Sequence, residues 1–418
     1  MILETLRYGI VGAGFVTGFH LRALEQVRGV EVTGITSRTP PHELAQSARD
    51  RGLGSCNVYE SVAEMAKDVD IVAIFNPNHL RVEVMEQLAQ SGAQLRGLVC
   101  EKPLARNLTE AYRVNELAAK IGAPTAYFEN QVHMGLVRAA RAQLADVAET
   151  MGPLTLARSN EEHAGPHNAW FWDPTLQGGG VLSDMGCHCL AVGWYMLTPE
   201  GKPPTHLEPV SVSADIGLLK WGQPRWREAL LQRHGVDYAK TPAEDFATGI
   251  VTYRDPETGQ MSKAQFTVSW MYDKQGLRLL VDGIGPGYAL EANTLRSSLE
   301  IFIGDDAAAA VANAEQALEK ATASRGLLAI QPNEPDLYGY VEEHRDALTA
   351  FRDGRSAFLD FDYGVEIVRL TMAAYRSAEE RRVIDLTDPT ERAALDSYVP
   401  LVQQGLGAEL LRPAVQRT

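Results

Sequence analysis

Three side chains of this sequence could move a proton, and they stand in two separate stretches. Lys102 follows an apolar run and precedes a proline, whereas Asp184 and His188 are four residues apart, the spacing that a helix places on one face. An Asp one turn before a His can orient and polarise the imidazole, which then serves as an acid or a base. Each feature alone is more often structural, because a lysine at a strand end is usually a surface residue and an isolated Asp/His pair usually supports a fold.

The stretch that carries Lys102 predicts a position at the edge of a sheet. Residues 98–101 suit a buried strand, and Pro103 cannot continue a strand ladder, so the chain must leave the sheet there. Lys102 then lies at the carboxyl edge, where open α/β sheets bind their ligands.

A glycine-rich turn near the start of the chain predicts a dinucleotide site. Residues 8–11 read as a short apolar strand, and the Gly12-Ala13-Gly14 turn leads into a helical pattern. Gly12 would make the tight turn, and Gly14 would let the backbone approach a pyrophosphate at the helix N-terminus. The residues expected to hold the cofactor here are Gly12, Gly14, Phe15 and Val16.

This turn departs from the usual fingerprint at its third glycine. Thr17 occupies that position and Gly18 follows it, ahead of a helix expected over residues 19–27. Thr17 is small, so close packing of the helix on the strand remains compatible with the sequence.

The second strand, residues 30–35, bears on the choice between NAD and NADP. An acidic residue at its tip would bind the ribose hydroxyls of NAD, but Glu31 lies at the wrong end. Ser37 and Arg38 at the tip suit a 2′-phosphate and favour NADP, although a serine and main-chain groups can also hold a free ribose.

Strands and helices alternate through residue 128, which predicts a parallel, doubly wound Rossmann sheet in a domain spanning residues 1–128. The carboxyl ends of its strands meet at one edge. The further residues expected to face the cofactor there are Asn76, Pro77, His79, Glu101, Lys102 and Asn130.

The second part of the chain, residues 129–418, is predicted to be an α+β domain with a large open mixed, mostly antiparallel sheet. Its expected strands cover residues 210–218, 248–254, 263–271, 278–282, 288–291 and 299–303, after a first strand over residues 153–158. A hairpin signal lies at residues 255–259. Expected helices cover residues 306–323, 337–353 and 365–381, and the C-terminal helices could pack back on the first domain.

A loop rich in His and Trp, residues 161–174, is a candidate substrate-binding segment. Sugars favour aromatic faces beside hydrogen-bonding side chains, which makes His163, His167, Trp170 and Trp172 candidates for substrate contact. The alternative is a Trp-rich plug that packs under the loop. The two histidines lack a carboxylate or cysteine at a convincing spacing, so no metal site is expected.

Composition narrows the class of protein. The 418 residues carry a net charge of -15, which argues against a nucleic-acid partner. Four cysteines in such a length favour reduced thiols and a cytoplasmic protein. The N-terminus lacks the pattern of a signal peptide, and no apolar run approaches the roughly 18 residues of a membrane helix.

Together these motifs resemble the Gfo/Idh/MocA oxidoreductase family, over residues 8–386. The resemblance is carried by Gly12-Ala13-Gly14, Glu101-Lys102-Pro103, the run from Gly178-Gly179-Gly180 through Asp184 and Gly186 to His188, and more weakly by Glu244-Asp245. It implies a nicotinamide cofactor, a sugar or cyclitol substrate, and hydride transfer at a carbinol carbon. It also implies a homodimer or homotetramer built through the open sheet.

The same resemblance implies a role for each of the three side chains. Lys102 would bind the substrate hydroxyl and the nicotinamide and assist proton transfer, and Asp184 would bind a neighbouring hydroxyl. His188 would act as the general base in oxidation. Alcohol oxidation loses a proton as hydride leaves, so a base of near-neutral pKa and a nearby cation suit the reaction.

Departures from the family pattern bear on which substrate is bound, and two other functions also stay open. Arg81 stands where a His is frequent, Ala191 where an Asp is common, and residues 129–133 replace an Arg-aromatic pair. One alternative is an enzyme that retains NAD and cycles through a ketone, as a glycosidase or isomerase would. Another is a nucleotide-sensing regulator without catalysis, against which the intact Lys102 and His188 argue.

Overall fold

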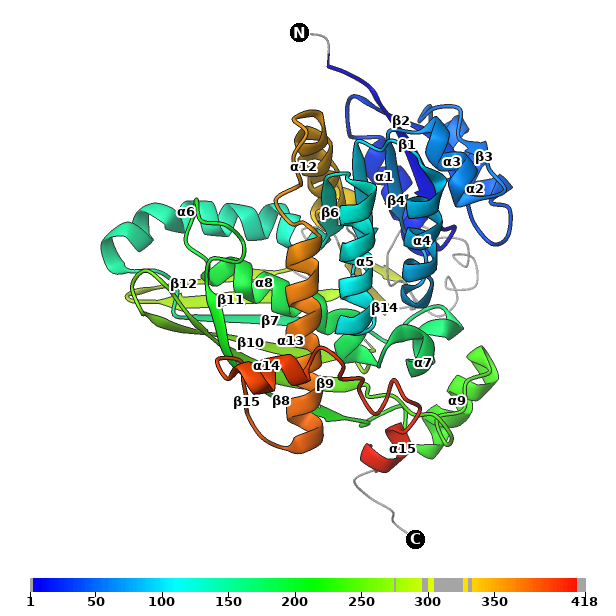
Figure 1. The fold of residues 1–418 in the computed structure, drawn as a ribbon. Helices are drawn as coiled ribbons and strands as arrows, with labels where there is room; N and C mark the ends of the chain where they lie inside the picture. Colours follow the sequence, from blue (N-terminus) through cyan, green and yellow to red (C-terminus); the bar gives the residue numbers. More distant parts are fainter. Residues whose placement is uncertain (1–2, 274–275, 295–299, 304–325, 330–332, 412–418) are drawn as a thin grey trace. The chain divides into compact units, whose positions relative to one another are not determined.

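The computed structural model describes residues 3–273, 276–294, 300–303, 326–329 and 333–411. The chain divides into two compact units, each of which is described by itself (Figure 1). Unit 1 comprises Met1–Gly135 and Pro335–Arg369, and unit 2 comprises Leu136–Glu334 and Leu370–Thr418. The segment from Pro335 therefore groups with the N-terminal part of the chain rather than with its sequence neighbours.

Unit 1 is built on a six-stranded sheet in which every neighbouring pair is parallel, in the order β3-β2-β1-β4-β5-β6. This order and direction confirm the predicted doubly wound sheet. The inner strands β4 and β5 and the edge strand β6 are buried at every position, as strands covered on both faces must be. The strands are β1 (Leu6–Val11), β2 (Val30–Thr36), β3 (Asn57–Val58), β4 (Ile71–Ile74), β5 (Gly97–Glu101) and β6 (Thr125–Phe128).

Helices connect these strands and cover the sheet. Helices α3, α4 and α5 contact one another in series, and α1 packs against α12 from the later segment. The helices are α1 (Phe15–Leu24), α2 (His42–Asp50), α3 (Val62–Asp68), α4 (Arg81–Ser91), α5 (Leu108–Ile121) and α12 (Tyr340–Arg352), with short turns η1 (Asn78–Leu80), η2 (Asn130–His133) and α11 (Glu334–Leu337).

The first helix begins earlier than its apolar pattern indicates. The sequence predicts a start at Phe19, whereas α1 starts at Phe15 with Gly14 as its extended N-cap. Inside the first turn the Thr17 hydroxyl donates to the Gly12 carbonyl at 3.1 Å, which joins the helix to the preceding turn. The apolar pattern missed this turn because its buried side chain, Thr17, is polar and its large apolar side chain, Phe15, is exposed.

Unit 2 contains a seven-stranded mixed sheet in the order β12-β11-β7-β10-β9-β8-β15. Only the β7–β10 pair is parallel among the described strands of this sheet, which confirms the mixed, mostly antiparallel prediction. The strands are β7 (Leu156–Glu162), β8 (Glu208–Gly217), β9 (Phe246–Arg254), β10 (Met261–Ser269), β11 (Arg278–Gly285), β12 (Tyr288–Asn293) and β15 (Ile384–Asp385), and β13 (Glu300–Ile303) pairs separately with β14 (Gly326–Ala329).

One apolar helix packs against the middle of this sheet. Helix α8 (Cys187–Leu197) is buried along its whole length and contacts β7 and β10. Helix α13 (Phe361–Glu380) contributes residues to both units. The remaining segments are α6 (Gly135–Met151), η3 (Ala169–Trp172), α7 (Pro174–Gln177), η4 (Leu182–Gly186), α9 (Pro224–His234), α14 (Pro389–Ala394) and α15 (Gly407–Leu410).

One strand expected in unit 2 is wrong in its bounds, and another strand was missed. The strand expected over residues 153–158 is β7, which begins at Leu156 and continues to Glu162 because both β10 and β11 pair with it up to that residue. The edge strand β15, which pairs with β8, was not expected from its two-residue length. The helix expected over residues 306–323 lies outside the described residues.

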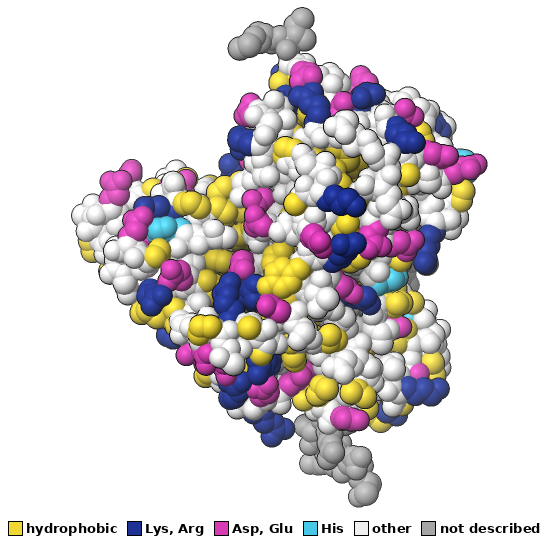
Figure 2. Space-filling model, in the orientation of Figure 1, with side chains coloured by type: hydrophobic (Ala, Val, Ile, Leu, Met, Phe, Trp, Pro, Cys, Tyr) yellow, Lys and Arg dark blue, Asp and Glu magenta, His cyan; other side chains and the backbone are white. Residues whose placement is uncertain are grey.

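The charged side chains on the surface and the length and polarity of the helices agree with what the sequence composition predicts. On the face drawn in Figure 2, Lys and Arg side chains are interspersed with Asp and Glu. Over the described part of the chain, the helices are too short or too polar to cross a bilayer.

The start of β5 offers a test of packing in unit 1. A Cβ at Gly97 would overlap the buried ring of Phe351 on α12, whereas a Cβ at Gly18 on α1 would meet nothing within 4 Å. We expect Gly97→Ala to lower the free energy of unfolding by about 1–3 kcal/mol. Gly18→Ala, the matched control, should leave it unchanged or raise it by up to about 1 kcal/mol. Urea unfolding measures both, and equal effects would contradict this packing.

Candidate functional site

In unit 1 the ends of β1 and β4 approach each other closely at the glycine turn. Gly12 has a φ of 117°, and its N–H donates to the Thr36 carbonyl at 2.9 Å. A Cβ at Gly12 would lie 2.8 Å from the backbone nitrogen of Asn76, so no other residue fits without moving a strand end. The Oδ1 atom of Asn76 is buried and has no hydrogen-bond partner among the described residues.

The helix start beside this turn is open. A Cβ at Gly14 would meet nothing within 4 Å, and the following Phe15 is 45% exposed although it is large and apolar. Val16 is half-buried, and the first turn of α1 carries no acidic side chain. The positive dipole end of this ten-residue helix suits an anionic group. The pyrophosphate site stays a prediction, and the open helix start is compatible with it.

The tip of β2 is accessible for a second contact. Arg38 is exposed, and the Ser37 hydroxyl donates to the Thr39 carbonyl at 2.8 Å. Both residues follow directly on β2, the neighbour of β1, at the edge of the sheet that carries Gly12.

Lys102 follows β5 at this same edge, and its backbone is fixed on two sides. Its N–H donates to the Phe128 carbonyl at 3.2 Å, and the Arg81 Nη2 donates to its carbonyl at 3.1 Å. The Lys102 side chain is partly exposed, whereas Glu101 is buried. A buried arginine thus holds the strand end from which the lysine extends.

Three other predicted cofactor residues lie at this edge with different surroundings. Pro77 and His79 are half-buried in the turn after β4. Asn130 is buried, and its side-chain amide donates to the Tyr338 carbonyl at 2.7 Å. Asn130 therefore stabilises the contact with the returning C-terminal segment, so we do not include it in the proposed cofactor site.

In unit 2 the glycine run is packed against a buried carboxylate and a tyrosine. A Cβ at Gly179 would overlap the Tyr375 hydroxyl, and one at Gly180 would overlap the Glu244 backbone. Glu244 Oε1 accepts three hydrogen bonds, from Tyr375 Oη at 2.6 Å, Gly180 N at 2.9 Å and Leu182 N at 3.0 Å. The tyrosine hydroxyl in turn accepts the N–H of Ser183 at 3.1 Å.

These bonds explain an irregular helix start. The sequence predicts one regular helix through Asp184 and His188, whereas Leu182–Gly186 form a π-helical turn before α8. The N–H groups of Gly180, Leu182 and Ser183 bond to side chains, so the chain enters the helix in a wider turn. Such π-helical turns are frequent at functional sites. Asp184 and His188 are both buried, one on the π-helical turn and one on α8.

The pKa of the Glu244 carboxyl lies well above its ordinary value. Burial raises its pKa to about 7, against the opposing effect of its three hydrogen-bond donors. Its Oε2 is buried without a partner among the described residues. The next residue, Asp245, is also buried and accepts the N–H groups of Leu219, Lys220 and Trp221. The Glu-Asp pair thus holds two loops of unit 2 from one position.

The loop rich in His and Trp divides into packed and exposed residues. Trp172 is buried between Trp221 and Trp270, with ring centroids at 4.8 and 4.9 Å, and its indole N–H donates to the Pro166 carbonyl. The surroundings of Trp172 thus agree with the alternative of a Trp-rich plug under the loop rather than with a substrate contact.

The other three predicted residues of this loop have different surroundings. His163 is buried, and its Nδ1 accepts the Gly165 N–H at 2.9 Å. His167 is exposed, and Trp170 is half-buried and stacks on Phe171.

Sequence reasoning missed several buried residues of both units. His20, Glu343 and His344 form a cluster with Glu101, and Tyr375 binds the glycine run. A histidine on the apolar face of α1 was the only local signal. The others come from helices far along the chain, which the motifs do not indicate.

The comparisons with known proteins agree with this description. Residues 6–128 match a family model described as an oxidoreductase family with an NAD-binding Rossmann fold, and residues 137–284 match the GFO/IDH/MocA C-terminal domain.

Among curated proteins, the chain is 23% identical over 214 residues to levoglucosan dehydrogenase of Pseudarthrobacter phenanthrenivorans, a match covering 47% of this chain and 52% of that protein. It is 26% identical to D-glucoside 3-dehydrogenase of Escherichia coli, over 47% of this chain and 55% of that protein. The chain thus spans about half the length of the curated relatives that it matches.

Among solved structures, the fold is similar to that of GenD2 from gentamicin A biosynthesis in complex with NAD. The TM-score is 0.71 at 23% identity, covering 92% of this chain and 97% of that chain.

The buried Glu244 predicts a pH dependence of stability in unit 2. Its carboxyl ionises near 4.5 when unfolded and near 7 when folded, so the folded state binds more protons between these values. Its contribution is complete below about pH 4.5 and is lost as the pH rises through about 7. We expect this loss to amount to roughly 2–4 kcal/mol.

Two substitutions isolate this effect. Glu244→Gln keeps the oxygen that accepts all three hydrogen bonds and removes the ionisation, so its stability should fall less than that of the wild type between pH 5 and 8. Glu244→Ala leaves three donors without their acceptor and should be less stable at every pH, by roughly 3 kcal/mol or more. Urea unfolding across this pH range gives the free energy of unfolding of each variant. If this free energy changed with pH in the same way for the wild type and Glu244→Gln, the raised pKa of Glu244 would be contradicted.

Proposed function

Because this chain belongs to the Gfo/Idh/MocA oxidoreductase family, we propose that it is an NAD(P)-dependent dehydrogenase acting on a CH–OH group. The substrate class is a sugar, a sugar derivative, a glycoside or a cyclitol. The observation that carries the proposal is the common sheet edge in unit 1. The Gly12 turn, the Asn76 strand end and Lys102 follow the adjacent strands β1, β4 and β5 there.

The residues of this edge fit a nicotinamide dinucleotide. Gly12 and Gly14 leave room for a pyrophosphate against the N-terminus of α1, and the exposed Phe15 offers an apolar surface to it. Asn76 has an acceptor without a partner among the described residues. When bound, the cofactor supplies a hydride acceptor for the substrate carbon.

Lys102, Asp184 and His188 are the residues proposed to act on the substrate. An alcohol that loses a hydride must also lose its hydroxyl proton, and His188 accepts this proton as general base. Lys102 stabilises the developing alkoxide as a cation, and Asp184 binds a neighbouring hydroxyl. The presence of all three residues argues against a non-catalytic regulator.

The names of the relatives support the proposed substrate class. Levoglucosan, D-glucosides and inositol all present secondary hydroxyl groups on a ring, and the matched proteins are named as their dehydrogenases. These names favour the dehydrogenase over an enzyme that retains NAD through an isomerisation or a glycoside cleavage. Trp172 is packed inside unit 2, so we propose Trp170 and His167 as the accessible residues of that loop for substrate contact.

Assembly and location belong to the same proposal. The open face of the unit 2 sheet carries cross-strand polar pairs such as Arg158–Asp282 and Arg278–Glu162, which could pair with a second copy in a homodimer or homotetramer. The four cysteines are buried and form no disulfide among the described residues, which fits a cytoplasmic protein.

The tip of β2 tests the preference for NADP over NAD. We expect Arg38→Ala to raise the Kd for NADP⁺ by roughly tenfold or more while the Kd for NAD⁺ stays nearly unchanged, because only NADP⁺ carries the 2′-phosphate. Arg28→Ala is the matched control, since Arg28 is an exposed arginine at the opposite end of the same strand. Isothermal calorimetry gives both constants, and an equal loss for the two cofactors would contradict the role of Arg38.

Substitution of the proposed catalytic residues tests the reaction. We expect Lys102→Ala and His188→Ala each to lower kcat by roughly 100- to 10,000-fold, while the Kd for NAD(P)⁺ stays within a few-fold of the wild type. Reduction of NAD(P)⁺ with the best substrate of a panel of polyols, aldoses and glycosides gives kcat. Either variant turning over near the wild-type rate would show that the assignment is wrong.

A further inference from the structure

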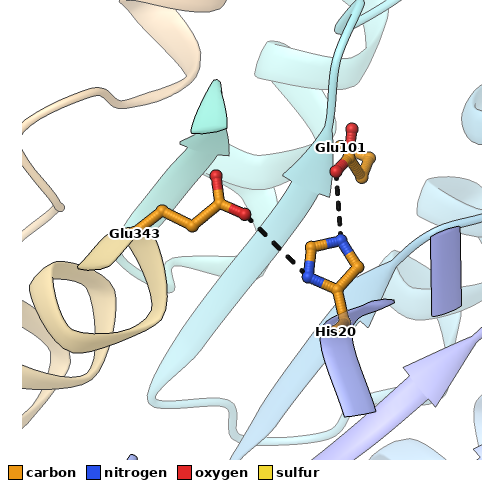
Figure 3. Close-up of side chains that lie close together, drawn as sticks. All are labelled: His20, Glu101 and Glu343. Atoms are coloured by element: carbon orange, nitrogen blue, oxygen red, sulfur yellow. Dashed lines mark hydrogen bonds and ion pairs between the residues drawn. The ribbon is translucent and has the colours of Figure 1, made fainter. Parts of the chain in front are cut away.

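Four ionisable side chains from four elements of unit 1 form a buried chain that ends one residue before Lys102. His20 of α1 lies with its Nε2 3.0 Å from Glu101 Oε1 and its Nδ1 3.0 Å from His344 Nε2 (Figure 3 draws the His20–Glu101 contact). The Nδ1 of His344 lies 3.5 Å from the hydroxyl of Tyr8 on β1. All four residues are 0–4% exposed.

Packing fixes the orientation of the central ring. His20 stacks on Phe75 with ring centroids 3.8 Å apart and an angle of 11°, and it meets His344 at an angle of 89°. The Nε2 of His20 therefore faces Glu101, and its Nδ1 faces His344. Glu343, on the same helix as His344, lies on the Nδ1 side with its Oε1 at 3.9 Å (Figure 3).

The two glutamates flank opposite sides of the His20 ring, which argues against a shared cation. A metal ligand uses one lone pair of one ring nitrogen, whereas Glu101 faces Nε2 and Glu343 faces Nδ1. The distance of 3.0 Å between Nε2 and Oε1 is that of a hydrogen bond. We therefore interpret the cluster as hydrogen-bonded.

The charges of the cluster can be assigned from its surroundings. Burial raises the pKa of Glu343 well above its ordinary value, and the charges of Glu101 and Glu129 raise it further, so Glu343 is a neutral acid. Burial lowers the pKa of both His20 and His344, which makes both rings neutral.

Glu101 is the exception in this cluster. Burial disfavours its ionised form, but the hydrogen bond from His20, the charge that His20 carries when protonated, and the charges of Lys102 and Arg81 hold its pKa below the ordinary value. The network therefore carries one negative charge, on Glu101.

This charge sets the direction of every hydrogen bond in the chain. An ionised Glu101 only accepts, so His20 donates through Nε2–H and its Nδ1 is an acceptor. His344 must then donate through its own Nε2–H, which leaves its Nδ1 to accept from the Tyr8 hydroxyl. Three successive donors thus point toward Glu101, and each polarises the next.

We propose that this chain fixes a single negative charge on Glu101 and thereby keeps the adjacent Lys102 in its ammonium form. His20, His344 and Tyr8 are positioning residues that act through Glu101. The use of this ammonium in catalysis rests on the proposed dehydrogenase function, but the chain and its effect on Lys102 do not. The other ionisable groups that face this cluster are Arg81 of α4, Glu343 of α12 and, next to Glu343, Glu129 after β6.

The first experiment examines the chain itself. Long-range ¹H–¹⁵N spectra of the full chain labelled in histidine distinguish the two tautomers and the charged form, and the His20→Gln and His344→Gln variants assign the signals. Both residues are expected as the neutral Nε2–H tautomer from pH 6 to 9. An Nδ1–H tautomer for His20, or charging of either ring in this range, would overturn the proposal.

The second experiment examines Lys102. Competitive acetylation followed by mass spectrometry gives the pH at which Lys102 becomes reactive, relative to the other lysines of the same chain. Glu101→Gln removes the charge and should move this pH down by roughly one unit. His20→Leu should do the same, because the carboxylate loses its donor and takes up a proton, whereas His20→Gln retains a donor at the Nε2 position and should stay near the wild type.

Glu343→Gln is the matched control. It replaces a neutral acid with a neutral amide in the same cluster, so the reactivity of Lys102 should not change. An equal shift for Glu343→Gln and Glu101→Gln, or no shift for Glu101→Gln with native stability, would overturn the proposal. Neither experiment needs turnover, so a failed dehydrogenase assay would refute the proposed function and leave this inference standing. If the enzyme is active, the basic limb of kcat should move with the reactivity of Lys102.

Discussion

A buried carboxylate needs hydrogen-bond donors, and this requirement determines how elements pack in both units. In unit 1 the Glu101 carboxylate is buried, and the His20 ring on α1 supplies its hydrogen bond. In unit 2 the buried Glu244 collects one hydroxyl and two N–H groups on a single oxygen, and Asp245 collects three N–H groups. An uncompensated buried carboxylate costs several kcal/mol, so the elements that supply these donors are fixed relative to their carboxylate.

Each buried carboxylate also supports a residue that the proposed chemistry requires. Glu101 precedes Lys102, and the Glu244–Tyr375 pair shapes the π-helical turn that carries Asp184 and leads to His188. The reactive groups themselves are few. The polar contacts around them connect helices from distant parts of the chain to the end of β5 or to the glycine run of unit 2. These contacts hold the side chains in place.

The sequence predicted the elements whose formation depends on residues close together in the chain. Gly12 is required because a Cβ at this position would lie 2.8 Å from the backbone nitrogen of Asn76 at the end of β4. A glycine between a predicted strand and a predicted helix can be recognised in the sequence. The position of Lys102 followed from Pro103, and the mixed sheet from alternating patterns. The His20–His344 contact joins residues 324 positions apart, and the Tyr375–Glu244 bond spans 131 positions. Motif spacing carries no information on such pairs, and Trp172 shows that an aromatic loop signal does not distinguish packing from binding.

Hydride transfer from a ring carbinol to the nicotinamide is the central claim, and isotope transfer measures it directly. The purified protein would be incubated with NAD⁺ or NADP⁺ and with sugars, glycosides and cyclitols that carry deuterium on the ring carbons. The reduced cofactor would then be analysed by mass spectrometry. The account predicts that at least one substrate yields reduced cofactor carrying one deuterium, together with the matching ketone. Reduced cofactor without deuterium, or a cofactor that binds but is never reduced by any substrate of this class, would contradict it.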